Sequence, residues 1–438
     1  MLVLGALPWD PAYAQSRQIS ILRDAEIEDT IRVYADPLFV AAGLDPQSIN
    51  IHLVNDRSLN AFVSNGRNMF MFSGLLMSTD DPNQIIGVIA HETGHIAGGH
   101  LVSVRGEVEK ATAAAILSTI LGIAVAAATG EGAAAAAGST IGSGIAQREF
   151  FRYTRTQESA ADQAALSYLD ATGQSSEGLY DLLRTFENQE LLSATNQDPY
   201  MRTHPLTSDR LQAVKHHIEV SPHSNAPADP DLMMRQARMV AKLVGFLESL
   251  RVTLQRYPES DQSIPARYAR SIAYFQDRQM DKAVPLIDGL IAEEPDNPYF
   301  HELKGQMLFE TGSGDLALAS YAQSVELAPD QPLLAIGYAQ ALIESGEETN
   351  LEIAASSLEQ ALRIEPRNAT AWRLLGMAYG RLGLEARASV ASAEFSYLTG
   401  DHQQAEFLAR RAVQGLEYGT PDWQRANDIL NALNAGDG

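Results

Sequence analysis

The C-terminal half of this 438-residue chain repeats itself, and a repeat restricts the possible folds more than any other feature of the sequence. An alanine stands twelve residues before a proline in the segments Ala283–Pro295, Ala317–Pro329 and Ala354–Pro366. Successive prolines are 34 and 37 residues apart. A unit of this length suits a pair of helices that stacks on the next pair, because one pair alone cannot bury its apolar face. We therefore expect an all-α stack of helix pairs in residues 263–438.

The residues within one unit agree with a known repeat pattern. The segment WRLLGMAYGRLG matches the first helix of a tetratricopeptide repeat at Trp372, Leu375, Gly376 and Tyr379. Gly305 and Tyr274 occupy equivalent positions in earlier units. A small residue is needed where paired helices approach closely, and a proline ends the second helix. The repeats carry no obvious chemistry of their own, so we expect them to bind other proteins.

Composition excludes several functions. The chain has a net charge of −23 and no markedly basic stretch. Nucleic-acid binding needs clustered Lys and Arg for phosphate contacts, so we expect no nucleic-acid partner. The same deficit argues against simple electrostatic docking on anionic lipid. The absence of cysteine excludes disulfides, thiolate nucleophiles and cysteine zinc sites.

The N-terminus has the pattern of an export signal. MLVLGALPWDPAYAQ is an apolar run that ends in Ala12-Tyr13-Ala14, the small-residue pattern that precedes cleavage. We expect residues 1–14 to be a signal peptide, truncated because a positively charged start is missing, and the exported protein to begin near Gln15. The alternative is a short buried N-terminal segment, which the polar run QSRQ directly after it disfavours.

Residues 15–222 are expected to form the first domain, with both strands and helices. Ile49–Asp56 alternates like a strand, and Asn60–Leu76 predicts a β-hairpin. The polar, proline-rich VSPHSNAPADPD then marks a domain boundary. We interpret residues 223–262 as a linker followed by a bridging helix.

The segment IIGVIAHETGHIAGGHL places three histidines and a glutamate on one expected helix, with Asp80 or Asp81 as its N-cap. His91 and His95 are four residues apart, so both imidazoles project from one helical face and can bind one metal ion. Zinc suits such ligands, and Glu92 lies where it can act as general base on a zinc-bound water. A solvated helix face with incidental histidines is the alternative, and the apolar flanking residues disfavour it.

His100 is a tempting third ligand, but its spacing is wrong. Enzymes with the longer pattern H-E-x-x-H-x-x-G-x-x-H take a third histidine from the same segment. Gly98 fits that pattern, but the histidine position is occupied by Leu101. We therefore reject His100 as a metal ligand and interpret it as a local structural group.

A second helix offers a carboxylate instead. RTQESAADQAALSYL contains Glu158, with Asp162 one turn later. In this arrangement Glu158 binds zinc, and Asp162 accepts a hydrogen bond from the second ring nitrogen of a zinc histidine, His91, which fixes its tautomer. An ordinary acidic helix face is the alternative.

At this point the chain resembles a known family. HETGHIAGGH followed by ESAAD is similar to the zinc metallopeptidases related to HtpX and the CAAX prenyl endopeptidases. With THPLTSDR and the repeats, nearly the whole exported chain resembles the BepA (YfgC) type from the Gram-negative periplasm. The resemblance implies an α+β, mainly α, zincin-type metallopeptidase domain before an all-α tetratricopeptide domain. It also implies one zinc ion held by His91, His95 and Glu158, with Glu92 catalytic.

The resemblance implies a further role for THPLTSDR. In BepA-type proteins a histidine at the position of His204 can occupy the open position of zinc and hold the enzyme latent, because a fourth protein ligand displaces the reactive water. The alternative is a loop histidine fixed by Pro205. Arg210 is expected to stabilise the oxyanion or bind substrate backbone, or else to pair with an acid such as Asp209.

An Ala/Gly-rich insert separates the two motifs. Residues 111–146 contain a single charge, Glu131, and residues 111–130 are uncharged, which meets the length criterion for a membrane span. HtpX-like relatives have a membrane hairpin at this place. Because large apolar side chains are few, we expect a helical hairpin that shields the active-site cleft or touches the outer membrane or a membrane partner. A true span and an irregular loop are the alternatives, in that order.

One strand is expected to receive the substrate. We predict that an extended substrate pairs with an edge strand formed by Asn68, Met69, Phe70, Met71 and Phe72. An ordinary core strand is the alternative.

These observations together favour a periplasmic zinc endopeptidase, with association with the outer membrane as a further expectation. The resemblance suggests unfolded or misassembled outer-membrane proteins as substrates and their assembly machinery as a partner of the repeats. A chaperone or assembly factor whose peptidase is largely silenced by His204 is the competing interpretation. A repeat scaffold with an inactive peptidase is disfavoured, since the ligands and the base are all present.

Overall fold

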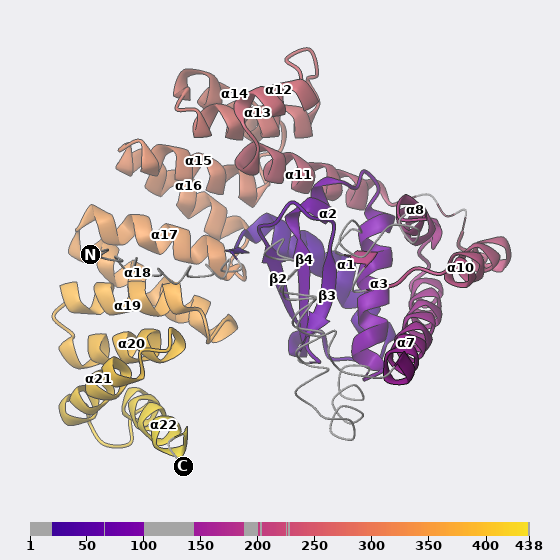
Figure 1. Cartoon of the computed structure of the whole chain (residues 1–438). Coiled ribbons are helices and arrows are strands. Elements are labelled where there is room, and N and C mark those ends of the chain that lie inside the picture. The colour runs from indigo at the N-terminus through magenta and orange to yellow at the C-terminus, as the bar shows by residue number, and fades with distance from the viewer. Residues whose placement is uncertain are drawn as a thin grey trace, which may run out of the picture. The chain divides into compact units, whose positions relative to one another are not determined.

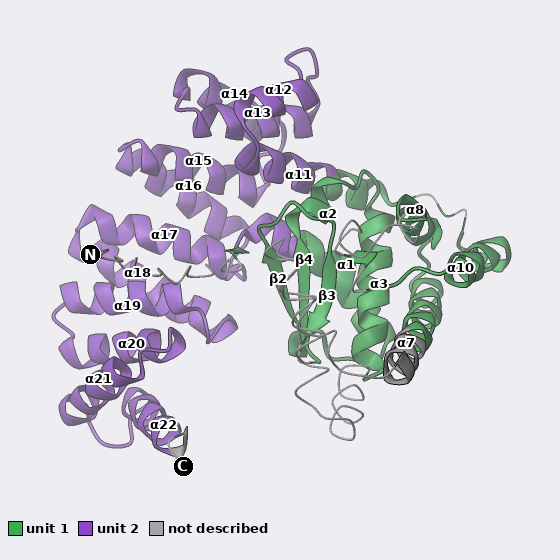
Figure 2. Cartoon of the chain, viewed as in Figure 1, with its two compact units in different colours: residues 1–22, 30–236 green, residues 23–29, 237–438 purple. Residues whose placement is uncertain are grey.

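The computed structural model of the chain describes two compact units (Figure 2). The described residues are 20–64, 66–99, 144–187, 200–201, 204–224, 226 and 228–436. Unit 1 holds Met1–Leu22 and Thr30–Gln236, and unit 2 holds Ala237–Gly438 together with Arg23–Asp29. The division falls inside helix α11 (Pro230–Leu247). The predictions for the signal peptide 1–14, for His100 and for the insert up to residue 143 lie outside the described residues.

Unit 1 contains a four-stranded sheet (Figure 1). Its strands are β1 (Ile21–Leu22), β2 (Asn50–Val54), β3 (Ala61–Ser64) and β4 (Asn68–Phe72). The predicted hairpin is confirmed, because β3 and β4 pair in antiparallel register with Ala61 opposite Met71. The order across the sheet is β1-β2-β4-β3, and β2 pairs with β4 in parallel register.

The prediction that Asn68–Phe72 forms the edge strand is wrong. These residues form β4, which has β2 on one side and β3 on the other, so both rows of its backbone groups face a neighbouring strand. The sequence pattern identifies the strands of a hairpin but not which of them enters the sheet. Among the described strands, β3 is the hairpin strand that lies at the edge of the sheet. Its backbone N–H and C=O groups that point away from β4 are the ones that an extended peptide could reach.

The helices of unit 1 are α1 (Ala25–Ala41), η1 (Pro46–Ser48), α2 (Ser73–Met77), α3 (Pro82–Ala97), α7 (Gly144–Ala171), α8 (Glu177–Thr185) and α10 (Ser208–Val220). The predicted start of α3 is confirmed: the Asp81 carboxylate accepts a hydrogen bond from the backbone N–H of Asn83. Pro82 stands in the first turn, where no backbone donor is needed. α3 packs against β3 on one side and against α7 and α8 on the other, so it is buried over most of its length (Figure 1).

Unit 2 is all α and confirms the predicted helix pairs. It contains α11 (Pro230–Leu247), α12 (Leu250–Arg256), α13 (Ile264–Gln276), α14 (Met280–Glu293), α15 (Pro298–Glu310), α16 (Gly314–Leu327), α17 (Pro332–Ser345), α18 (Glu348–Ile364), α19 (Ala369–Arg381), α20 (Glu385–Leu398), α21 (His402–Gly415) and α22 (Pro421–Gly436). Consecutive helices from α13 onward pair as antiparallel neighbours (Figure 1). Left-handed glycines such as Gly312 and Gly346 form the turns within pairs.

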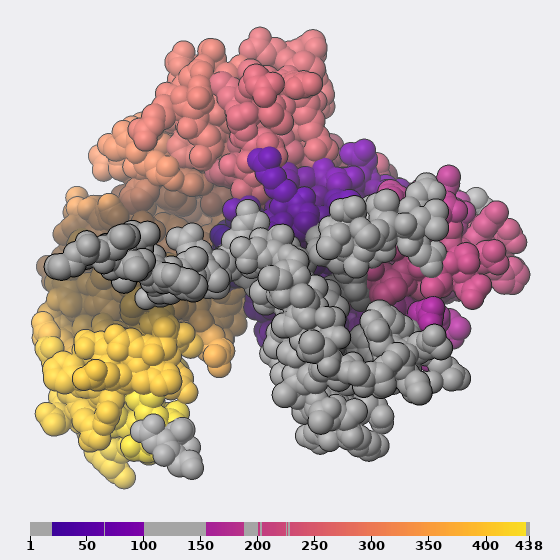
Figure 3. Space-filling view, viewed as in Figure 1, coloured from indigo at the N-terminus to yellow at the C-terminus, as the bar shows by residue number. Residues whose placement is uncertain are grey.

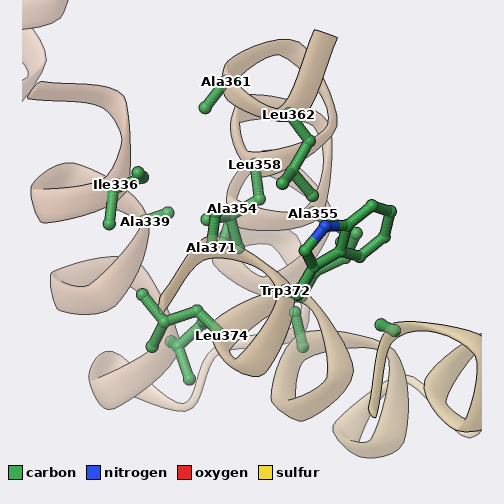
Figure 4. Close-up of a cluster of buried hydrophobic side chains, with 14 of the residues drawn as sticks. Ile336, Ala339, Ala354, Ala355, Leu358, Ala361, Leu362, Ala371, Trp372 and Leu374 are labelled. Carbon is green, nitrogen blue, oxygen red and sulfur yellow. The ribbon is translucent and has the colours of Figure 1, made fainter. Parts of the chain in front are cut away.

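Close helix approach explains the small residues of the repeat pattern. A Cβ atom on Gly305 would lie 2.8 Å from the Tyr321 ring, and one on Gly376 would lie 2.9 Å from Ser392 Oγ. Trp372 packs in an apolar cluster with residues of α17 and α18 (Figure 4). The C-terminal helices α20 to α22 share another apolar cluster, and Figure 3 shows this end of the chain in yellow. None of the helices in the described ranges has both the length and the apolar character needed to cross a membrane.

Candidate metal centre

Three segments of unit 1 bring four possible ligands together. His91 and His95 come from α3, Glu158 comes from α7, and His204 comes from the segment just before α10. One nitrogen or oxygen atom from each of the four side chains lies within 4.8 Å of the others, and all four residues are buried. The structure thus brings together residues that are far apart in the sequence.

The distances between these atoms fit a single small cation. His91 Nε2 lies 3.1 Å from His95 Nε2, 3.3 Å from His204 Nδ1 and 3.3 Å from Glu158 Oε2. Glu158 Oε2 lies 3.3 Å from His204 Nδ1, and Glu158 Oε1 lies 3.3 Å from His95 Nε2. Ligands of a tetrahedral zinc ion with ordinary bond lengths stand about 3.3 Å apart. The set of three imidazoles and one carboxylate also suits such an ion.

Asp162 fixes the orientation of His91. Its Oδ1 atom lies 2.9 Å from His91 Nδ1, and both groups are buried. A hydrogen bond from Nδ1–H to this carboxylate makes Nε2 the bare nitrogen, which then faces His95 and His204. Asp162 stands one turn after Glu158 on α7, so the same helix provides both a possible ligand and the group that orients another.

Arg210 has a different role from the catalytic one expected. Its Nε and Nη2 atoms donate to the two Asp162 carboxylate oxygens at 2.6 and 2.9 Å, and Nη1 lies 3.0 Å from Glu158 Oε2. Nη1 also donates to the Pro205 carbonyl at 2.9 Å. Each guanidinium nitrogen is therefore committed to the protein, which leaves Arg210 badly placed to bind an oxyanion. It pairs with Asp162 and Glu158 rather than with Asp209, because it lies in the first turn of α10, which packs against α7.

Glu92 lies at the centre without a hydrogen-bond partner. It is fully buried, and neither carboxylate oxygen accepts a hydrogen bond from the described groups. His204 is an ionisable neighbour, and its Nε2 atom lies 3.3 Å from Glu92 Oε1. A buried carboxylate without partners is costly unless a cation or a bound water completes its surroundings. This orphaned group is independent support for a metal and water at the centre.

His204 joins the centre to the edge of the sheet. One ring nitrogen, Nδ1, faces His91 and Glu158, and the other, Nε2, lies 3.3 Å from the Ala61 carbonyl oxygen of β3. The ring of Tyr200 packs against it with centroids 4.8 Å apart. Ala61 was not among the residues expected from the sequence, and only the strand order reveals that its carbonyl lies on the free edge.

The charges around His91 favour a cation at this position. Burial by itself would lower the pKa of His91, but hydrogen bonds and charge interactions with Asp162 and Glu158 overcome this and raise the pKa to about 10. Burial would raise the pKa of Glu158, but the charges of His204 and Arg210 hold it well below its ordinary value. The centre thus keeps ionised carboxylates beside imidazoles, as a metal site requires.

Gly94 lets the two ligand-bearing helices meet. A Cβ atom on Gly94 would lie 2.7 Å from the Ala161 carbonyl oxygen and 2.9 Å from Ala161 Cα, both backbone atoms of α7. Gly94 lies between the two histidines of α3, and Ala161 lies between Glu158 and Asp162. Gly94 was not among the site residues expected from the sequence, although a glycine inside a buried helix is a signal of close helix packing.

Comparison with known families agrees with this geometry. Residues 22–218 match peptidase family M48, and residues 291–395 match the tetratricopeptide domain of cytochrome c-type biogenesis protein H. Residues 22–218 therefore correspond to a metallopeptidase domain of family M48, and a region that matches a tetratricopeptide domain follows them.

Most of the chain resembles a particular type within this class. A protein of Vibrio cholerae named putative beta-barrel assembly-enhancing protease is 24% identical to this chain, over 91% of this chain and 82% of that protein. Relatives with the name beta-barrel assembly-enhancing protease occur in further species. In Yersinia pestis the identity is 23%, over 94% of this chain and 85% of the relative. In Escherichia coli K12 it is 22%, over 87% of this chain and 77% of the relative.

Proposed function

We propose that the chain is a zinc-dependent endopeptidase of the bacterial periplasm that cleaves unfolded or misassembled outer-membrane proteins. The observation that carries the proposal is the group of His91, His95, Glu158 and His204 around the orphaned carboxylate of Glu92. The names of the relatives support outer-membrane proteins as the substrate class. The signal-like N-terminus supports export.

His91, His95 and Glu158 would hold the ion, and Glu92 would perform the proton transfers. When bound, zinc lowers the pKa of a water molecule and polarises the scissile carbonyl. The Glu92 carboxylate accepts the proton of the attacking water and later donates it to the leaving amine. Asp162 keeps Nε2 of His91 available, and Arg210 holds Asp162 and Glu158 in place.

The substrate would pair with β3 rather than with β4. Ala61 presents its carbonyl on the free edge, where His204 Nε2 now lies 3.3 Å away. An extended peptide added to this edge would bring its backbone beside the candidate metal centre. His204 therefore occupies both a ligand position and the place beside β3 where the substrate backbone would lie, and it must move before a substrate can bind.

A second candidate function is favoured by the same residue. If His204 stays in place, the protein acts as an assembly factor that binds clients or the assembly machinery through its repeats, with the peptidase latent. Its contacts with His91, Glu158, Glu92 and Ala61 support this resting state. Membrane contact through residues 111–146 remains a prediction.

Zinc content and proteolysis of an unfolded outer-membrane protein distinguish the two candidates. We expect the wild type and Glu92→Gln to hold one zinc ion per chain, with cleavage lost in the variant because the base is gone. His204→Ala should keep zinc and cleave faster than the wild type, because a ligand position and the β3 edge are freed.

The outcomes separate three interpretations. Full zinc content with no cleavage by any variant supports the assembly factor and contradicts the peptidase. Absence of zinc from the wild type, with no change in metal content or stability on His91→Ala, contradicts the metal centre itself. His216→Ala is a matched control, since this exposed histidine lies outside the centre and should leave zinc and cleavage unchanged.

A further inference from the structure

The first seven residues described after β1 belong to the repeat unit and not to the peptidase unit. Arg23–Asp29, with the sequence RDAEIED, groups with unit 2, whereas the same helix α1 continues into unit 1 from Thr30. Asp24 begins this helix by accepting a hydrogen bond from the Ile27 backbone N–H. The segment is thus an acidic helix start that packs on the repeat unit.

Two carboxylates of the segment pair with cations of α11: Lys242 is buried, and the side chain of Arg238 is 12% exposed. Asp24 Oδ2 lies 2.9 Å from Lys242 Nζ, and Glu26 Oε1 lies 3.1 Å from Arg238 Nε. The other Glu26 oxygen accepts a hydrogen bond of 2.8 Å from the Tyr268 hydroxyl of α13. Lys242 and Glu26 are each only 1% exposed.

The rest of the segment contacts the next repeats. Gln331 donates from Nε2 to the Asp29 carboxylate at 3.2 Å, and Tyr299 of α15 shares a hydrogen bond with the same carboxylate. Ala25 is buried in an apolar cluster with Tyr299 and Leu334. The segment therefore contacts α11 and the first helices of the next three helix pairs, α13, α15 and α17. The carboxylates of Asp24, Glu26 and Asp29 each have their own partners.

Burial makes this recognition selective for carboxylates. Removing one partner of a buried ion pair leaves an uncompensated charge, which is strongly unfavourable. A neutral segment of the same shape would leave the buried Lys242 in that state and would remove the Glu26 partner of the half-buried Arg238. Glu294 and Glu302 also lie near these cations, at 3.3 and 3.6 Å, but they remain partly exposed and do not replace the buried Glu26.

We propose that Arg238, Lys242, Tyr268, Tyr299 and Gln331, here called the docking face, form a binding site for acidic helix starts, and that residues 23–29 are its built-in occupant. The expected partner is a segment with carboxylates at positions i, i+2 and i+5, as in Asp24, Glu26 and Asp29. An acidic segment of a partner protein would compete for the docking face. The proposal is independent of the peptidase chemistry.

The built-in occupant has a large advantage over a free peptide. A ligand tethered by a short chain acts at an effective concentration of about millimolar, so a peptide in trans cannot compete at micromolar concentration. Neutralising the carboxylates of the tethered segment weakens its binding and so removes this advantage, while the residues of the docking face stay unchanged. A binding experiment must therefore start from a chain whose own segment is neutralised.

Fluorescence anisotropy with a labelled peptide tests the proposal on the full chain. The probe is the peptide SILRDAEIEDT, residues 20–30 of this chain. The variant Asp24→Asn/Glu26→Gln/Asp29→Asn should bind it at least tenfold more tightly than the wild type. The matched control Glu347→Gln/Glu348→Gln/Glu352→Gln removes three exposed acids of unit 2 and should bind like the wild type.

A neutral peptide, SILRNAQIENT, completes the test. It should bind the first triple variant at least tenfold more weakly than the acidic peptide, and adding Lys242→Met should abolish the preference. Equal binding of both peptides, or no gain over the wild type, overturns the proposal. If circular dichroism shows that the triple variant is unfolded, Asp24→Asn replaces it, with the same expected direction and the same overturning results.

Discussion

At the scale of single residues, one missing side chain decides whether the candidate ligands meet. Gly94, which lies between His91 and His95, brings α3 against the backbone of α7 at Ala161, which lies between Glu158 and Asp162. Gly94→Ala would force the helices apart, because the added Cβ meets backbone atoms at 2.7 and 2.9 Å. We expect at least a tenfold loss of zinc affinity, measured by competition with a chromogenic chelator.

A matched glycine isolates this effect. Gly380 lies in helix α19 with nothing within 4 Å of an added Cβ, so Gly380→Ala should leave zinc affinity unchanged and stabilise the helix by up to about 1 kcal/mol. If Gly94→Ala binds zinc as tightly as Gly380→Ala, the close approach of α3 and α7 does not position the ligands.

Much of the centre could be predicted at this scale, but only where the chemistry is local. The two histidines and Glu92 follow from helical spacing, since α3 fixes their relative directions. Arg210 could not be assigned, because its partners Asp162 and Glu158 are 48 and 52 residues away in the sequence, and only the packing of α10 on α7 selects them over Asp209.

At the scale of elements, the outer backbone row of β3 distinguishes it from the other strands. In an antiparallel strand the N–H and C=O groups of one residue point to the same side, and this side alternates along the strand. The Ala61 carbonyl points away from β4, towards His204, so the backbone groups of Val63, two residues later, also point away from β4. Val63→Pro would remove an outward N–H and keep the β3–β4 pairing. We expect at least a tenfold loss of cleavage in the His204→Ala background.

The neighbouring position provides the contrast. The backbone of Phe62 points inward to Phe70, so Phe62→Pro would break the hairpin and lower the thermal midpoint, whereas Val63→Pro should change the midpoint little. Full activity of a folded Val63→Pro variant would contradict substrate pairing on β3.

The strand order shows where prediction from sequence stops. The alternation of apolar residues predicts the strands, and the turn between β3 and β4 predicts their pairing. Whether β4 or β3 pairs with β2 depends on contacts between distant residues, such as Ile51 with Met69, which no local pattern contains. For that reason the hairpin was correctly predicted and its edge was not.

At the scale of the whole molecule, the two units share helices, and this sharing was not visible in the sequence. RDAEIED is typical of an ordinary acidic helix start. Its docking on α11, α13 and α15 depends on Lys242 and Arg238, two cations more than 200 residues later that reach the segment only when the repeats fold. Composition predicts a domain boundary within residues 223–262. It does not predict that the first turns of α1 belong to unit 2, because that depends on tertiary contacts.

The charges at the docking face also make stability depend on pH. Burial raises the pKa of Glu302, Lys242 opposes this, and Asp24 and Glu26 add to it, which leaves a pKa of about 7. The ordinary value is 4.5, so the folded chain holds this proton more tightly than the unfolded chain. The resulting stability is complete below about pH 4.5 and is lost as the pH rises to about 7.

Glu302→Gln tests this dependence, because the amide resembles the protonated acid. The side chain is 23% exposed and partly screened, so we expect the variant to be more stable than the wild type by roughly 1 kcal/mol at pH 8. At pH 4.5 the difference should vanish. Urea unfolding of the full chain at both pH values measures it, with the exposed Glu348→Gln as control. An equal difference at both pH values would show that Glu302 does not titrate between them.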